Sequence, residues 1–135
     1  MIADQENTLP PTPQRASPEM LLQRVRQHLI DYLEVASSLE AQLAFQAKSP
    51  ELDVAREMIE QWADWVSPDW QSELVAPVFS TAEIAAIAQF QTTWSRISAA
   101  LPQPLLPLDQ MLATDHWDEL RAAANAAWQI FQQAT

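Results

Sequence analysis

The chain contains no glycine among its 135 residues, although average usage would give a chain of this length about nine. Glycine supplies positive φ angles and allows the backbone to approach a ligand closely. Its absence excludes the phosphate-binding P-loop, the dinucleotide-binding turn and the nucleophile elbow, whose geometry depends on glycine. It also disfavours a sheet of tight hairpins. We therefore expect a helical protein.

Signals for helix starts recur along the chain. Three of them place serine before proline and an acidic residue, one is a capping box of serine with glutamate three residues later, and one is Thr-Asp. The hydroxyl accepts a hydrogen bond from a first-turn amide, proline suits the first helical position, and the acid stabilises the positive end of the helix dipole. These starts are Ser17, Ser49, Ser67, Ser80 and Thr114.

Apolar residues at steps of three and four predict the helices that follow these starts. The predicted helices cover residues 18–46, 50–66, 68–75, 81–101 and 115–133, with one further turn at 108–112. In the first helix the stripe consists of Leu22, Val25, Leu29, Tyr32, Ala36, Leu39 and Leu43. Short connections favour antiparallel neighbours. The predicted fold is all-α, an antiparallel bundle of four to five helices.

Two segments of the chain are rich in proline. Residues 1–16 contain three prolines among polar residues, which is typical of polyproline II or disorder. We expect them to form a flexible tail, with a short docking peptide as the alternative, and residues 17–135 to form one helical domain. Residues 102–107 contain three more prolines and cannot continue a helix. They predict an extended strap between the last two long helices, with its leucines lying over the bundle.

The absence of cysteine excludes disulfides, thiolate zinc sites and cysteine nucleophiles, and fits a reducing compartment. The first residues form no apolar signal-peptide core, and no run of 18 apolar residues occurs. We therefore expect neither secretion nor a membrane span. The predicted location is cytoplasmic.

No catalytic, cofactor or metal site is expected. The only imidazoles are His28 and His116, and neither has an acid three residues before it, as helical di-iron sites require. No local context marks a serine nucleophile with its base and oxyanion hole. The chain is therefore predicted not to be an enzyme. An enzyme or ligand carrier with an apolar cavity inside the bundle is a weaker alternative.

The chain has 18 acidic and 7 basic residues, a formal net charge of -11. This charge repels phosphate backbones and anionic lipids. We therefore expect no nucleic-acid or membrane partner, whereas a basic protein partner is compatible. Plain solubility is the alternative explanation of the acidity.

One group of residues predicts a binding surface. Four acids in the helix over 50–66 recur at steps of four, three and four, and further acids and two tryptophans follow at the next corner. Tryptophan is enriched where a large ring fills a partner's pocket. A solvated face and core packing are the alternatives. The predicted partner-binding residues are Asp53, Glu57, Glu60, Asp64, Trp65, Asp69, Trp70 and Glu73.

These features predict a small acidic protein-binding module that masks a basic partner. Toxin-immunity proteins, enzyme inhibitors and secretion chaperones share its size and charge only. In an immunity-type mechanism the acidic face would cover a basic active site, one molecule for one. The alternative is a structural or assembly protein that forms a homodimer through its long first helix.

Overall fold

A computed structural model describes residues 17–133, and every regular element within this range is a helix. The predicted all-α fold is confirmed. Four helices are long: α2 (Pro18–Ala36), α4 (Val54–Trp65), α6 (Thr81–Ala100) and α8 (Asp115–Gln133). Three are short: α3 (Leu39–Lys48), α5 (Trp70–Glu73) and α7 (Leu108–Met111). The predicted tail, residues 1–16, lies outside the described residues.

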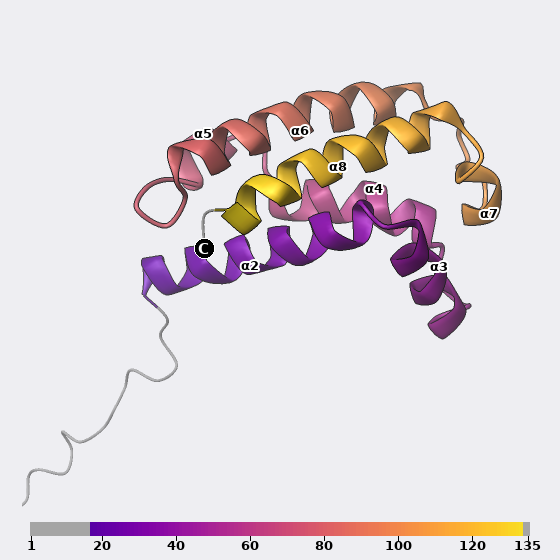
Figure 1. Ribbon diagram of the computed structural model, residues 1–135, viewed down its shortest axis with the longest axis horizontal. Coiled ribbons are helices and arrows are strands. Elements are labelled where there is room, and N and C mark those ends of the chain that lie inside the picture. The colour runs from indigo at the N-terminus through magenta and orange to yellow at the C-terminus, as the bar shows by residue number, and fades with distance from the viewer. Residues whose placement is uncertain (1–16, 134–135) are drawn as a thin grey trace, which may run out of the picture.

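The four long helices alternate in direction along the chain and form an antiparallel bundle (Figure 1). α8 packs against both α6 and α2, and α4 packs against α2. α3 and α7 lie at one end of the bundle, and α5 lies at the other (Figure 1). The connections between the long helices are longer than expected: each contains one short helix, α3, α5 or α7, and reverses the direction of the chain (Figure 1).

Aromatic side chains fill the middle of the bundle. The ring of Trp62 meets that of Phe90 edge-on, with centroids 4.6 Å apart, and Tyr32 lies 5.6 Å from Trp62. The Tyr32 hydroxyl donates a 2.5 Å hydrogen bond to the carbonyl oxygen of Met58. α2, α4 and α6 therefore pack together through these rings, and the buried Tyr32 hydroxyl has a hydrogen-bond partner.

An ion pair between a half-buried arginine and a buried glutamate also joins α2 to α6. Arg26 donates from Nε and Nη2 to the two carboxylate oxygens of Glu83, at 3.2 and 2.6 Å. Glu83 in turn accepts from the backbone amide of Ser80, which completes the predicted capping box. The hydrogen bonds to Glu83 raise the pKa of Arg26, and burial acts in the opposite direction.

The prediction of one helix over residues 18–46 is wrong, because the chain breaks between α2 and α3. Ser37 ends α2, and Ser38 adopts an extended conformation. The Ser38 hydroxyl accepts a 3.0 Å hydrogen bond from the amide of Ala41 and so caps α3. Two adjacent serines thus end one helix and start the next.

This break turns the end of the predicted stripe away from the core. Leu39 and Leu43 are exposed, whereas Gln42 is buried. The Gln42 amide donates to the carbonyl oxygens of Val35 and Ala36, at 3.2 and 3.0 Å, at the end of α2. The apolar face that the homodimer alternative needs is therefore limited to α2.

The helix predicted over residues 50–66 starts later than expected. A turn closes between Ser49 and Leu52, whose amide donates to the Ser49 carbonyl oxygen at 3.0 Å. Asp53 then caps α4, since its carboxylate accepts from a first-turn amide at 3.3 Å. The Ser-Pro pair therefore starts a turn here instead of a helix.

The other predicted elements hold with smaller changes. The Ser17 and Thr114 hydroxyls accept from the amides three residues later, as expected for caps. The helix predicted over 68–75 is reduced to the four residues of α5, and the prediction that Ser67 caps it is wrong, because Asp69 precedes α5. The proline-rich strap over 102–107 is confirmed: it contains no helix, and its two leucines are half-buried against the core.

Candidate functional site

α4 gathers the four predicted acids on one side. At 3.6 residues per turn, they fall within an arc of about 60° and span about 16 Å along the helix. Glu57 is half-buried and the other three are exposed, while the opposite face of α4 lies in the core. We call this surface the acidic stripe: Asp53, Glu57, Glu60 and Asp64.

The side-chain interactions of the stripe are weak. Arg56 forms an ion pair with Glu60 at 3.2 Å, and both side chains are well exposed. Gln61 donates a 3.0 Å hydrogen bond to the Glu57 carboxylate. Exposed ion pairs contribute little free energy because water and salt screen them. An incoming cation can therefore replace Arg56 at Glu60 with little loss.

The two further predicted acids lie beyond the end of α4. Asp69 precedes α5 and Glu73 ends it, and both side chains are exposed. The Ser67 hydroxyl donates a 2.9 Å hydrogen bond to the Glu73 carboxylate. Both acids thus belong to the surface at the corner that follows the stripe.

The two tryptophans predicted for the binding surface differ in their exposure. Trp70 is 6% exposed and belongs to the core, so its assignment to an exposed surface is wrong. Trp65 is 38% exposed, and one face of its ring stacks on His28 of α2 with centroids 4.0 Å apart. On α4 it lies about 100° around the helix from the stripe. Trp65 therefore borders α2 instead of standing among the acids.

Sequence reasoning missed a hollow at the start of the stripe. It has a volume of about 490 Å³ and lies between α3, the turn before α4, the strap and α7. We call it the strap groove. Its apolar wall is made by Leu43, Leu52, Leu105 and Leu108, and Asp53 and Asp109 also line it.

A smaller hollow of about 250 Å³ joins the strap groove to the acidic stripe. Arg56 and Glu60 of the stripe line it on one side and the strap lines it on the other. Asp53 and Leu105 line both hollows. The acidic stripe and the strap groove therefore form one continuous surface.

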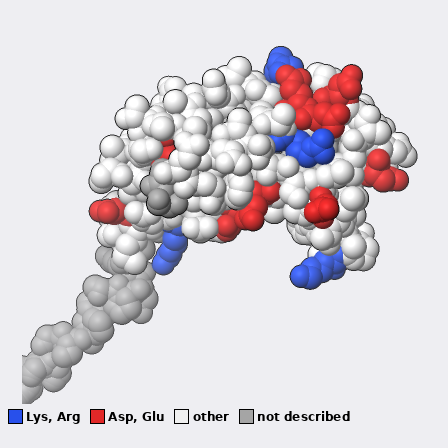
Figure 2. All heavy atoms as spheres, viewed as in Figure 1, with Lys and Arg blue, Asp and Glu red and all other residues white. Residues whose placement is uncertain are grey.

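A second acidic region lies at the end of the bundle where α7 and the start of α8 are found (Figure 2). Two arginines compensate it, because Arg96 pairs with Glu119 and Arg121 pairs with Asp118. The hydrogen bond from Arg96 lowers the pKa of Glu119. The acidic stripe, with four acids and a single arginine, is the less compensated of the two.

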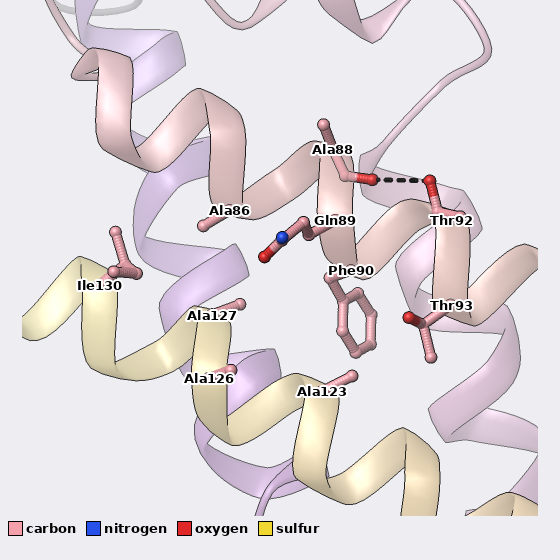
Figure 3. Close-up of a pocket in the computed structure, with 10 residues that line it drawn as sticks. All are labelled: Ala86, Ala88, Gln89, Phe90, Thr92, Thr93, Ala123, Ala126, Ala127 and Ile130. Atoms are coloured by element: carbon pink, nitrogen blue, oxygen red, sulfur yellow. Dashed lines mark hydrogen bonds between the residues drawn. The ribbon is translucent and has the colours of Figure 1, made fainter.

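Another groove, of about 450 Å³, runs between α6 and α8 (Figure 3). Its lining residues are alanines, threonines, Gln89, Phe90 and Ile130, none of which is ionisable. The Thr92 hydroxyl is bonded to the Ala88 carbonyl oxygen at 3.1 Å. This groove offers shape and small apolar side chains but no group for acid–base chemistry.

Across residues 17–133, no three His, Cys, Asp or Glu side chains are grouped so that they could hold a metal ion. Within the same range, no helix has both the length and the apolar character to cross a membrane. Comparison with protein-family models, with curated proteins and with solved structures finds no match for this chain.

Proposed function

We propose that the chain is a small protein-binding module that masks a basic protein partner with its acidic stripe. The observation that carries the proposal is the arc of Asp53, Glu57, Glu60 and Asp64 on the outer side of α4, with Arg56 as its one compensating base. Such a surface attracts lysines and arginines of a partner over a distance and orients the encounter.

The rigidity of α4 supports this function. Its inner face is fixed in the core by Val54, Ala55, Met58 and Trp62. Carboxylates on a helix held in this way need little ordering when a partner binds, which lowers the entropic cost of association. The stripe is therefore a preorganised template for positive charge.

The proposed action is stoichiometric. Covering a basic active site would neutralise an enzyme without any chemistry by the chain, as immunity proteins and inhibitors do, and covering a basic export segment would serve a secretion chaperone. The net charge of -11 favours a protein partner over nucleic acid or anionic lipid. A cytoplasmic location belongs to this proposal because the chain has no cysteine.

The test compares two charge reversals of equal size. The first variant is E57K/E60K/D64K; Asp53 is left in place because it caps α4. The control is E19K/D31K/E34K, whose three acids are exposed on α2. Each protein is immobilised, exposed at low salt to lysate of the source cells and eluted with rising salt. Circular dichroism first establishes that both variants are folded.

The proposal expects a basic protein that wild type and control retain and release with salt, and that the stripe variant loses. With that partner purified, its association rate should fall steeply with salt for wild type and become insensitive to salt for the stripe variant. Equal binding by both variants overturns the proposal. A mass that rises with concentration in light scattering, without such a partner, favours the assembly alternative instead.

A further inference from the structure

We propose that the strap groove receives one large apolar side chain of the basic partner, while lysines or arginines beside that side chain pair with Asp53 and Asp109. This inference rests on the proposed function and names the chemistry of the partner segment. The occupant is thus a basic segment with an aromatic or leucine side chain at its centre. The acidic stripe guides this segment, and the groove anchors it.

Two of the four leucines of the apolar wall are open to water. Leu43 and Leu52 are 46% and 36% exposed, and the volume of about 490 Å³ lies within the usual range of binding pockets, about 300–1,000 Å³. Covering exposed apolar area is favourable. Because these leucines stand at the rim, the groove is shallow. It suits a side chain carried on a polypeptide better than a small molecule that must be enclosed.

The groove is also held in shape before binding. Gln46 donates from Nε2 to the carbonyl oxygens of Leu52 and Ser49, at 2.6 and 3.3 Å. Its Oε1 accepts from the amide of Val54 at 3.2 Å. One side chain thus fixes the whole turn that carries Leu52 and Asp53, and this lowers the ordering cost of an incoming segment.

The charge around the groove selects the neighbours of the anchor. Asp53 and Asp109 both line the groove. Glu60 and its ion-pair partner Arg56 line the adjoining hollow. Carboxylates beside an apolar surface complement a side chain flanked by cations and repel one flanked by acids. The complementary segment is therefore both apolar and basic.

The test uses three synthetic peptides and the full ¹⁵N-labelled chain. Their sequences are Lys-Lys-Phe-Lys-Lys, Lys-Lys-Ala-Lys-Lys and Glu-Glu-Phe-Glu-Glu. Amide shifts are followed during titration, with the amides of Leu43, Leu52, Leu105 and Asp109 reporting on the groove and those of Glu57 and Asp64 on the stripe. The first peptide should shift the groove amides. The alanine peptide should bind at least about tenfold more weakly, because burying one large apolar side chain raises the affinity by at least about this factor.

Two variants locate the anchor. Leu43→Asn with Leu52→Asn removes the exposed apolar wall and should bring the phenylalanine peptide down to the affinity of the alanine peptide. Met20→Asn with Leu21→Asn is the matched control, because these side chains are 53% and 49% exposed on α2. This control should bind like wild type. The peptide comparison needs no variant, so it decides the proposal even if a substitution disturbs folding.

The outcomes separate the inference from the proposed function. Equal affinities of the two lysine peptides, with shifts confined to the stripe, overturn the anchor and leave the masking function standing. Equal binding of the glutamate peptide overturns the basic chemistry of the occupant. If no peptide shifts the groove amides, the anchor is also overturned, and salt-dependent capture decides the masking function independently.

Discussion

Arg26 and Glu83 form a two-pronged ion pair across the bundle, and the side chain of Glu83 is only 2% exposed. The guanidinium carbon also lies 5.6 Å from the ring centroid of Phe131 in α8. One arginine of α2 therefore contacts both α6 and α8. Burying the Glu83 carboxylate costs solvation free energy, so this carboxylate depends on the Arg26 cation.

Replacing Arg26 with methionine should lower the free energy of unfolding by about 3–5 kcal/mol, because it leaves the Glu83 carboxylate buried without its cation. Replacing both residues with methionine should be less harmful than the single change, since no isolated charge remains. Urea unfolding followed by circular dichroism measures each variant, and the double-mutant cycle gives the coupling between the two side chains.

The exposed pair Arg56–Glu60 provides the control. Its side chains are 63% and 58% exposed, so Arg56→Met should change the unfolding free energy by less than about 1 kcal/mol. Similar losses at Arg26 and Arg56 would contradict the assignment of the first pair as a buried, structural one. In that case the bundle would tolerate a bare carboxylate at Glu83.

Tyr32 should make stability depend on alkaline pH. It is the only tyrosine of the chain, and burial raises its pKa far above the ordinary value, which is about 10. The unfolded state loses the phenol proton above about pH 10 while the folded state keeps it. Tyr32 therefore leaves stability unchanged below that pH and lowers it as the pH rises further.

Phenolate absorbance measures this directly. It should appear only together with the loss of helical circular dichroism, whereas the chain in denaturant should titrate near the ordinary value of about 10. Tyr32→Phe should be about 1 kcal/mol less stable at neutral pH, because the bond to the Met58 carbonyl is lost. A phenolate signal that rises while the helices persist would show that the hydroxyl is accessible.

Local sequence patterns were sufficient to predict α6 and α8. Ser80 and Glu83 form their capping box as expected, and apolar residues such as Ile87, Phe90 and Phe131 are buried. These features involve residues within a few positions of one another, so periodicity and capping chemistry describe them completely. The acidic stripe on α4 was predictable for the same reason.

The inward position of Gln42 after the break, and the strap groove, depend on contacts between distant segments. Gln42 accepts a 2.8 Å hydrogen bond from the indole of Trp117, 75 positions away, and this contact favours turning glutamine inward in place of Leu43. The groove likewise combines α3 with the strap and α7. Spacing within one segment carries no information about such a pairing, so periodicity alone places Leu39 and Leu43 on the inner face.

Substitution of Gln42 should therefore lower the free energy of unfolding. Gln42→Leu removes both donors to the end of α2 and leaves the Trp117 indole nitrogen buried without its acceptor, so we expect a loss of about 2–3 kcal/mol. The control Gln23→Leu changes an exposed glutamine of α2 and should stay within about 0.5 kcal/mol of wild type. Both are measured by urea unfolding, and equal effects would mean that the Gln42 network adds nothing.

Trp128 should respond differently from Trp117 to the same change. Its indole nitrogen is buried and has no hydrogen-bond partner within the described residues, a situation that costs about 1–3 kcal/mol. Trp128→Phe removes this group, which offsets the smaller ring, so we expect a loss below about 1 kcal/mol. Trp117→Phe also leaves the buried Gln42 oxygen unpaired and should cost about 2–4 kcal/mol.

Urea unfolding followed by circular dichroism measures both tryptophan variants without relying on indole fluorescence. Adding Trp117→Phe to Gln42→Leu should cost less than Trp117→Phe alone, because in that background the indole nitrogen is already unpaired and its removal offsets part of the packing loss. The difference between the two backgrounds is the coupling free energy between Gln42 and Trp117, which includes the cost of leaving either partner unpaired. If Trp128→Phe is as damaging as Trp117→Phe, the unpartnered nitrogen does not weaken the native bundle, and packing alone sets the effect of both substitutions.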